Sequence, residues 1–237
     1  MNCNDMFSFF KAFRQSILFM FKNRSFAQLG EDLVISNHLE WLGYNIKDKG
    51  NYLDIGCYHP HDGSNTNLFY KQGSRGVNVD IGKLKEILFK IFRPGDIFIN
   101  SAVVPDSMVG NRFKFNLIGY GKKTDNLKIV EDTMANNFVD VIGISNLLET
   151  YTTNFFKTWS IISIDAEGMD GAIVESINFT KYPFSIVAFE MFFDDAKNKI
   201  KKSINNSTHD YLEKYGYILQ SVCGPTYIYF RKSETKS

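Results

Sequence analysis

The stretch Asn51-Tyr-Leu-Asp-Ile-Gly-Cys-Tyr-His-Pro60, followed by Gly63-Ser-Asn-Thr66, decides the expected fold. Its apolar run stops at Gly56, and a turn-rich segment then leads into a helix predicted from about residue 64 to residue 72. A buried strand, a glycine turn and a helix in this order are typical of the cofactor entrance of a parallel α/β sheet. The sequence therefore predicts a Rossmann-like sheet that binds a ligand at the carboxyl ends of its strands.

The glycine spacing in this loop separates two classes of cofactor. A dinucleotide needs the pattern G-x-G-x-x-G, because backbone must approach its pyrophosphate at a helix N-terminus. After Gly56 the next glycine is Gly63, so this pattern is missing. S-adenosylmethionine carries no phosphate and needs small polar groups for its methionine end and a carboxylate for its ribose. The loop therefore favours S-adenosylmethionine over NAD.

Strands and helices alternate along the rest of the chain. Apolar runs predict strands, helical spacing predicts the segments between them, and a Gly-Pro turn joins a final hairpin. The expected strands are residues 76–80, 97–103, 112–118, 159–165, 185–190, 217–222 and 226–231, with helices at 31–42, 84–92, from 170 and from 207, and a short strand running into a helix at 144–151. This order predicts an α/β, class I methyltransferase type of sheet: seven strands, mostly parallel, helices on both faces and an antiparallel C-terminal hairpin.

Bulk composition limits the functional class. The 237 residues suffice for one α/β domain with a short extension. A net charge of +1 argues against a nucleic-acid partner held by a basic surface. Three scattered cysteines without a C-x-x-C pattern indicate reduced thiols in a cytoplasmic protein, with neither a disulfide framework nor a zinc site.

The N-terminal residues 1–24 are predicted to form an amphipathic helical extension of a domain that spans residues 25–237. Residues 7–21 are apolar, but Lys11 and Arg14 interrupt them, so the segment is too short and too charged to span a bilayer. The expected role is packing on its own domain or on a second subunit of a homodimer. Peripheral contact with a membrane surface is the alternative.

Six segments, taken in order, resemble the FkbM-type methyltransferases, a branch of the S-adenosylmethionine-dependent Rossmann-like enzymes. The resemblance covers roughly residues 25–232 and rests on Ser25–Leu33, Leu53–Pro60, Ser64–Thr66, Gly73–Asp80, Asn100–Val103 and Ser163–Asp170. Ile81-Gly82 departs from the family, which often has a proline soon after the acidic residue. The resemblance implies an O-methyltransferase that acts on a hydroxyl of a sugar, a glycan or a secondary metabolite, with Gln28 among the cofactor residues.

The cofactor is expected to meet acidic and small polar groups at the ends of successive strands. Asp80 follows Gly56 by 24 positions, about where an acidic residue meets a ribose, although a strand-end aspartate also caps helices. Asp54 and Gly56 would flank the methionine end, and Ser64 and Asn65 would contact its carboxylate or cap the following helix. Further expected cofactor residues, where the third strand passes the adenine, are Asn100 and Ala102.

Three side chains are candidates for the general base that removes the hydroxyl proton. Asp165 and Glu167 lie two positions apart after a predicted strand, so both carboxylates could face one site. His59 in the cofactor loop is the third candidate. Alternatively, Asp165 contacts the amino group of the methionine and Glu167 caps a helix. A carboxylate pair could also hold a divalent cation, but few further ligands are evident, and we expect metal-independent catalysis.

Two other functions remain as alternatives. An NAD(P)-dependent oxidoreductase is disfavoured by the missing glycines and by the absence of a Tyr-x-x-x-Lys pair. A non-catalytic S-adenosylmethionine-binding or scaffold protein would keep the fold without the activity. The carboxylates at Asp54, Asp80, Asp165 and Glu167 argue against that interpretation, since a decayed site would be expected to lose some of them.

Overall fold

A computed structural model describes residues 25–110, 113–115, 127–129, 139–166, 168–191 and 207–232. The predicted N-terminal extension and Glu167 lie outside this described part of the chain.

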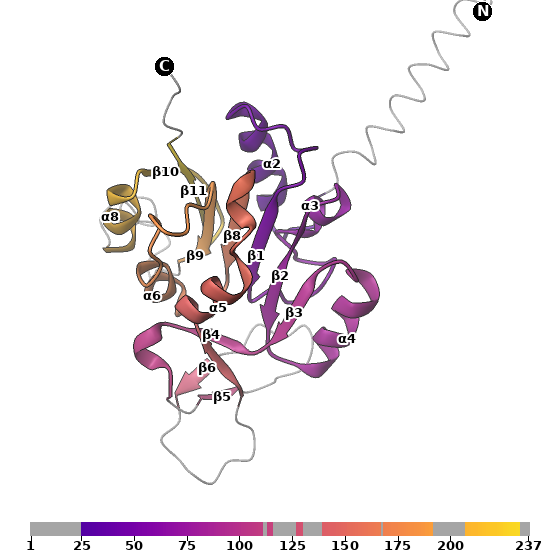
Figure 1. The fold of residues 1–237 in the computed structure, drawn as a ribbon, viewed down its shortest axis with the longest axis vertical. Coiled ribbons are helices and arrows are strands. Elements are labelled where there is room, and N and C mark those ends of the chain that lie inside the picture. Colours follow the sequence, from indigo (N-terminus) through magenta and orange to yellow (C-terminus); the bar gives the residue numbers. More distant parts are fainter. Residues whose placement is uncertain are drawn as a thin grey trace, which may run out of the picture.

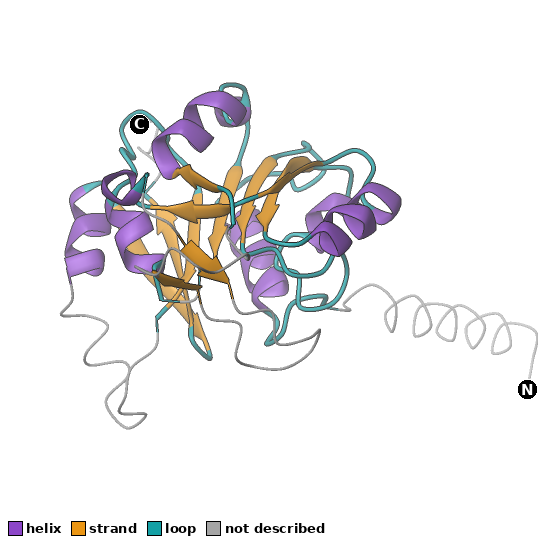
Figure 2. Cartoon of the chain, turned by 90° about the horizontal axis from the view of Figure 1, so that it is seen from below, coloured by secondary structure: helices purple, strands orange, loops and turns teal. Residues whose placement is uncertain are grey.

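Seven strands form the central sheet in the order β10-β11-β9-β8-β1-β2-β3 (Figures 1 and 2). The neighbouring pairs from β9 to β3 are all parallel, whereas β11 is antiparallel to both β9 and β10. The bounds are β1 Asn51–Ile55, β2 Arg75–Asp80, β3 Ile97–Asn100, β8 Ser160–Ile164, β9 Ile186–Glu190, β10 Tyr217–Cys223 and β11 Thr226–Arg231. The predicted fold class, with its closing antiparallel hairpin, is therefore confirmed.

Helices lie on both faces of this sheet, and two short pairs of strands stand beside it (Figure 2). The helices are α2 Glu31–Trp41, α3 Asn67–Lys71, α4 Lys83–Phe92, α5 Ile144–Tyr151, α6 Asp170–Glu175 and α8 Ser207–Lys214, with single 3-10 turns at Asp106–Met108 and Phe155–Lys157. The short pairs are β4 Ala102–Val104 with β7 Val141–Gly143, and β5 Phe113–Phe115 with β6 Leu127–Ile129.

Three sequence-based boundaries are wrong. The expected strand 97–103 breaks at Ser101. Its N–H still donates to the carbonyl of Asp80 in β2, but its hydroxyl and the N–H of Ala102 donate to the carbonyl of Asp140. The chain then continues as β4 in a different sheet. The helix expected from residue 64 begins at Asn67, and residues 144–151 are entirely helical, with the strand β7 immediately before them.

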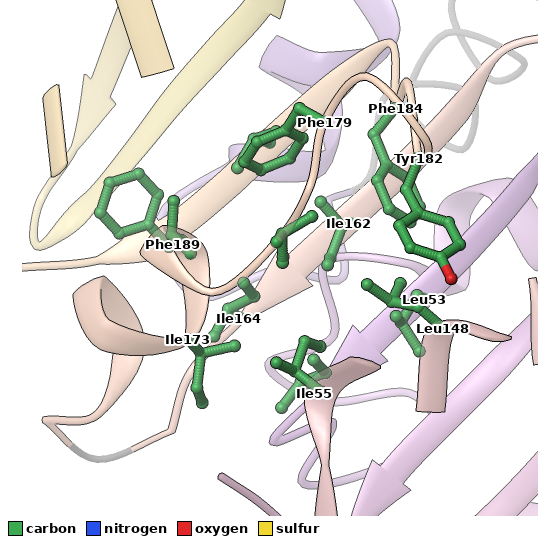
Figure 3. Close-up of a cluster of buried hydrophobic side chains, with 14 of the residues drawn as sticks. Leu53, Ile55, Leu148, Ile162, Ile164, Ile173, Phe179, Tyr182, Phe184 and Phe189 are labelled. Carbon is green, nitrogen blue, oxygen red and sulfur yellow. The ribbon is translucent and has the colours of Figure 1, made fainter. Parts of the chain in front are cut away.

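The larger apolar core lies on one face of the sheet (Figure 3). Alternate residues of the parallel strands point into it, and α5, α6 and α8 cover them. Its fully or nearly fully buried members include Leu53, Ile55, Ile162, Ile164, Phe189, Leu148, Ile173 and Leu212. The period of two along each strand therefore assigns the odd positions of β1 to this core.

The opposite face is half apolar and half polar. Tyr52, Ile161 and Trp159 pack there against Phe69 of α3 and the inner residues of α2. Nearer the carboxyl ends of the strands, the same face carries Asp54, Asn78 and Ser163, all buried. Buried polar groups cost free energy unless they are hydrogen-bonded, so this half of the face depends on partners.

Arg93, directly after α4, holds the groups that partner two of these residues: Thr66, which donates to Asp54, and Asp96, which accepts from Asn78. Its guanidinium is fully buried and donates to the Asp96 carboxylate (Nε to Oδ2, 2.8 Å). It also donates to the hydroxyls of Tyr52 (2.8 Å), Thr66 (3.0 Å) and Ser64 (3.3 Å). The charge is thus paired once and hydrogen-bonded three more times, which is what a buried ion pair requires.

We expect Arg93→Met to lower the free energy of unfolding by about 3–5 kcal/mol, because the substitution leaves the buried Asp96 carboxylate without its cation. Denaturation in urea, followed by circular dichroism, measures the change. Lys90→Met is the matched control, since Lys90 pairs with Glu86 on the exposed side of the same helix and should change the midpoint little. An Arg93 variant as stable as the control would show that the pair does not hold the fold.

Candidate functional site

The order in which the chain adds strands to the sheet reverses between the neighbouring strands β1 and β8. The chain runs from β1 towards β2 and β3 on one side and from β8 towards β9 on the other. In open α/β sheets this switch point, at the carboxyl ends of the strands, is where ligands bind. Gly56 and Asp165 follow the two strands here, and Asp165 N–H donates to the carbonyl of Ile55 at 2.9 Å. The structure thus brings two sequence-predicted site residues together.

Gly56 is required at this point by geometry. Its φ of +75° lies in the left-handed region, and its N–H donates to the carbonyl of Val79. A Cβ added at Gly56 would overlap the backbone carbonyl of Asp165. The absence of a side chain therefore allows the loops after β1 and β8 to touch.

Asp54 lies beneath this contact, with 4% of its surface exposed. Its Oδ2 accepts a hydrogen bond from the Thr66 hydroxyl at 2.5 Å. Burial raises the pKa of Asp54 from 3.8 to about 6, and the Thr66 hydrogen bond and the Arg93 charge only partly oppose this rise. The folded protein therefore holds the ionised Asp54 carboxylate at a cost in free energy. A ligand cation beside the carboxylate would offset this cost.

Ser64 and Asn65 anchor the start of α3. The Ser64 Oγ accepts the N–H of Asn67, the first residue of α3, at 3.2 Å, but the N-cap position is Thr66, so neither Ser64 nor Asn65 is the N-cap residue. Asn65 Nδ2 donates to the Ser163 hydroxyl of β8 at 3.1 Å and so ties the loop across the switch point. Contact of either side chain with a cofactor carboxylate stays a prediction.

Asp80 already holds three donors. Its Oδ2 accepts the N–H of Tyr58 at 2.7 Å, and its Oδ1 accepts the N–H of Ile81 at 2.6 Å and the ammonium of Lys85 at 2.8 Å. A carboxylate offers about four acceptor positions, so a ribose would share this group with Lys85 or displace it. The ribose role stays a prediction. Lys85 was missed by the sequence reasoning, although it faces inward on α4 among apolar neighbours.

The remaining cofactor candidates, Asn100, Ala102 and Gln28, lie in different parts of the structure. Asn100 pairs with Asp80 across β2 and β3, and its Oδ1 accepts the N–H of Gly82 at 2.9 Å. Ala102 is buried and lies in β4, past the break at Ser101, so the expectation that it continues the strand of Asn100 is wrong. Gln28 is exposed, and its side chain lies against Gly63 of the cofactor loop.

His59 has a defined orientation. Its Nδ1 accepts the backbone N–H groups of His61 (3.1 Å) and Asp62 (3.0 Å). A ring nitrogen that accepts hydrogen bonds carries no proton, so the neutral ring has its proton on Nε2. Burial and the neighbouring His61 also lower the pKa of His59 below 6.5. In this arrangement Nε2 is a donor, which is unfavourable for the role of general base.

Asp170, the first residue of α6, organises the loop after β8. Its buried carboxylate accepts the N–H of Ala166 at 2.9 Å and that of Gly168 at 3.0 Å. It thereby fixes the turn that carries Asp165, which is half-buried. Glu167 lies outside the described residues, so the shared orientation of the two carboxylates stays a prediction.

Two features are absent from the described residues, a metal-binding cluster and a membrane-spanning helix. In this part of the chain no three His, Cys, Asp or Glu side chains are grouped so as to hold a metal ion. Over the same residues, no helix has the length and apolarity needed to cross a membrane.

We expect the free energy of unfolding of wild type, measured relative to that of the Asp54→Asn variant, to rise as the pH falls from 7 to 4. Between pH 3.8 and about 6 the folded protein binds more protons at Asp54 than the unfolded chain does, so stability falls as pH rises through this window. The shift corresponds to about 3 kcal/mol. Urea denaturation of both proteins at several pH values measures it, and a difference that does not change with pH would contradict the account.

We expect nitrogen NMR of the histidine rings to find His59 protonated at Nε2 and unprotonated at Nδ1 at neutral pH. The reason is that two backbone N–H groups point at Nδ1. The titration midpoint should lie below 6.5. A proton on Nδ1 would overturn the assignment and restore Nε2 as a possible base.

No family model matches the chain, and no curated protein matches it. Among solved structures, the chain is similar to the crystal structure of monomeric WbdD, with a TM-score of 0.46 and 14% sequence identity. The match covers 86% of this chain and 41% of that chain, so this chain spans less than half the length of WbdD. The FkbM resemblance therefore rests on the sequence motifs alone.

Proposed function

We propose that this chain is an S-adenosylmethionine-dependent O-methyltransferase acting on a hydroxyl of a sugar, a glycan or a secondary metabolite. The observation that carries the proposal is the close approach of Gly56 to Asp165 at the switch point, with the buried Asp54 two positions before Gly56 in β1. A backbone turn and two carboxylates suit a ligand that is cationic at its methionine end. The cofactor, when bound, supplies the methyl group.

Two further side chains suit the methionine carboxylate and the ribose of that ligand. Asn65 offers an amide in the loop before α3, and Asp80 offers a carboxylate at the end of the adjacent strand β2, where a ribose is expected. A pyrophosphate at this turn would instead lie near the buried carboxylate of Asp54. Like charges at close range disfavour this, so the charges support S-adenosylmethionine over NAD(P).

The residues of the chain would contribute positioning and proton removal. Holding the acceptor oxygen in line with the methyl group can supply about 7–11 kcal/mol. A positioned base contributes a further factor of about 10²–10⁴. Because His59 presents Nε2–H in the observed arrangement, we assign the base to the carboxylates after β8, with Glu167 preferred and Asp165 touching the cofactor amino group.

The proposal is tested first by calorimetry. We expect S-adenosylmethionine to bind and NAD to bind far more weakly or not at all. Transfer of a radiolabelled methyl group to a panel of nucleotide sugars and glycans then tests activity and names the acceptor. Binding of S-adenosylmethionine without transfer to any acceptor of the panel would favour the non-catalytic alternative, and preferential binding of NAD would favour the oxidoreductase.

The same assay separates the roles of the two carboxylates. We expect Glu167→Gln to keep cofactor affinity and to lose about 10²–10⁴ in rate, as a base variant should. Asp165→Asn should lose both affinity and rate. Glu40→Gln, at an exposed position on α2, is the control and should change neither. Full activity of Glu167→Gln, unaffected by EDTA, would remove the proposed base.

A further inference from the structure

The outward side of α4 is apolar. Leu84, Ile87 and Ile91 repeat at intervals of three and four residues, which places them along one side of the helix. Phe89 is on the opposite side, buried against Phe98 of β3 with the ring centroids 5.0 Å apart. The helix is thus held by its inner side while a second apolar side faces outward.

This apolar side extends to the C-terminal end of the helix. Phe92 at its last position is exposed as well, although one side of its ring contacts His61, with the centroids 5.1 Å apart. Together with Leu84, Ile87 and Ile91 it is 47–62% exposed, and we call these four residues the α4 face. They account for four of the eleven exposed large hydrophobic side chains among the described residues, a concentration that marks an interaction surface.

Basic side chains border the α4 face. Lys83 and Lys90 are exposed on one flank of the helix. Arg75 is exposed where β2 begins, and its side chain lies against Gly95, in the turn that joins Phe92 to Ile97. Glu86 on the same helix is paired with Lys90, so its charge is compensated. The border is therefore net positive.

We propose that the α4 face docks on an anionic lipid bilayer. Protruding aliphatic and aromatic side chains enter the boundary between headgroups and acyl chains, and Lys83, Lys90 and Arg75 meet the negative lipid headgroups. The apolar area and the charges act together, as they do in membrane-surface helices. This inference does not depend on the proposed methyl transfer.

Charge distinguishes the bilayer from other occupants. A second copy bound face to face would bring Lys83 and Lys90 near the same residues of its partner. The N-terminal residues 1–24 carry four basic residues and one acidic residue, so they have the same sign as the border of the face. A nucleic acid would satisfy the charge, but a duplex would not bury the apolar side chains, and a single strand binds by stacking its bases on aromatic rings, whereas three of the four residues of the α4 face are aliphatic.

Vesicle co-sedimentation of the full chain tests the proposal. We expect binding to vesicles that contain phosphatidylglycerol and much weaker binding to vesicles of phosphatidylcholine alone. The double substitution Ile87→Gln and Ile91→Gln should lower the partition coefficient by about tenfold or more, because two aliphatic side chains no longer enter the lipid. Both positions are exposed, so the fold should be kept, which circular dichroism checks.

The matched control lies at the other edge of the sheet. Ile218→Gln and Val222→Gln remove exposed aliphatic side chains from β10, the strand farthest from β3 in the sheet order, and should leave binding unchanged. Equal loss in the control, or wild-type binding by the α4 variant, would overturn the proposal. Absence of wild-type binding would do so too, as would binding that is lost only on deletion of residues 1–24. Self-association that the α4 substitutions abolish, without vesicle binding, would identify a second copy as the occupant instead.

Discussion

One buried charge, the guanidinium of Arg93, holds the polar half of the sheet together. Its donors reach Tyr52 of β1, Ser64 and Thr66 before α3, and Asp96 before β3. Asp96 in turn accepts the N–H of Gly76 and the amide of Asn78 on β2. Segments far apart in sequence are thus fixed by a single cation. Removing any strong partner would leave a charge in the interior, which costs more than the pair contributes.

The same network influences the ionisation of Asp54 in the candidate site. Thr66 accepts from Arg93 and donates to Asp54, so the carboxylate beneath the Gly56 turn stands one hydrogen bond away from the buried cation. Arg93 lowers the pKa of Asp54, but burial raises it further, and the balance is a carboxyl with a pKa of about 6. A charge kept at a cost near a switch point indicates a functional group, since a purely structural position would favour a neutral residue.

The sequence predicts the sheet well because local patterns determine it. The apolar strands, the helical spacing of residues 84–92 and the Gly224-Pro225 turn all depend on neighbours along the chain. The break at Ser101 could not be predicted, because Asp140 supplies one of its hydrogen bonds from a distant segment. Arg93 is similar: before Pro94-Gly95 it resembles a surface residue, and only the tertiary structure buries it. For the site, the acidic residues are found from the sequence, but Lys85 as the partner of Asp80 is not.

Helix α4 links the candidate site to the proposed lipid-binding surface. Lys85 near its start holds Asp80 at the carboxyl end of β2, and Arg93 just after its end holds the loop before α3. Leu84, Ile87 and Ile91 on its outward side would be the groups that enter the lipid. A displacement of α4 would therefore act on the Asp80 loop at one end and on the Ser64 loop at the other. Because Phe89 and Arg93 are fully packed, the helix can transmit such a displacement only as a rigid unit. The sequence of α4 has the pattern of an ordinary amphipathic helix. Its packing thus gives the helix a structural role at its two ends and an interaction surface between them.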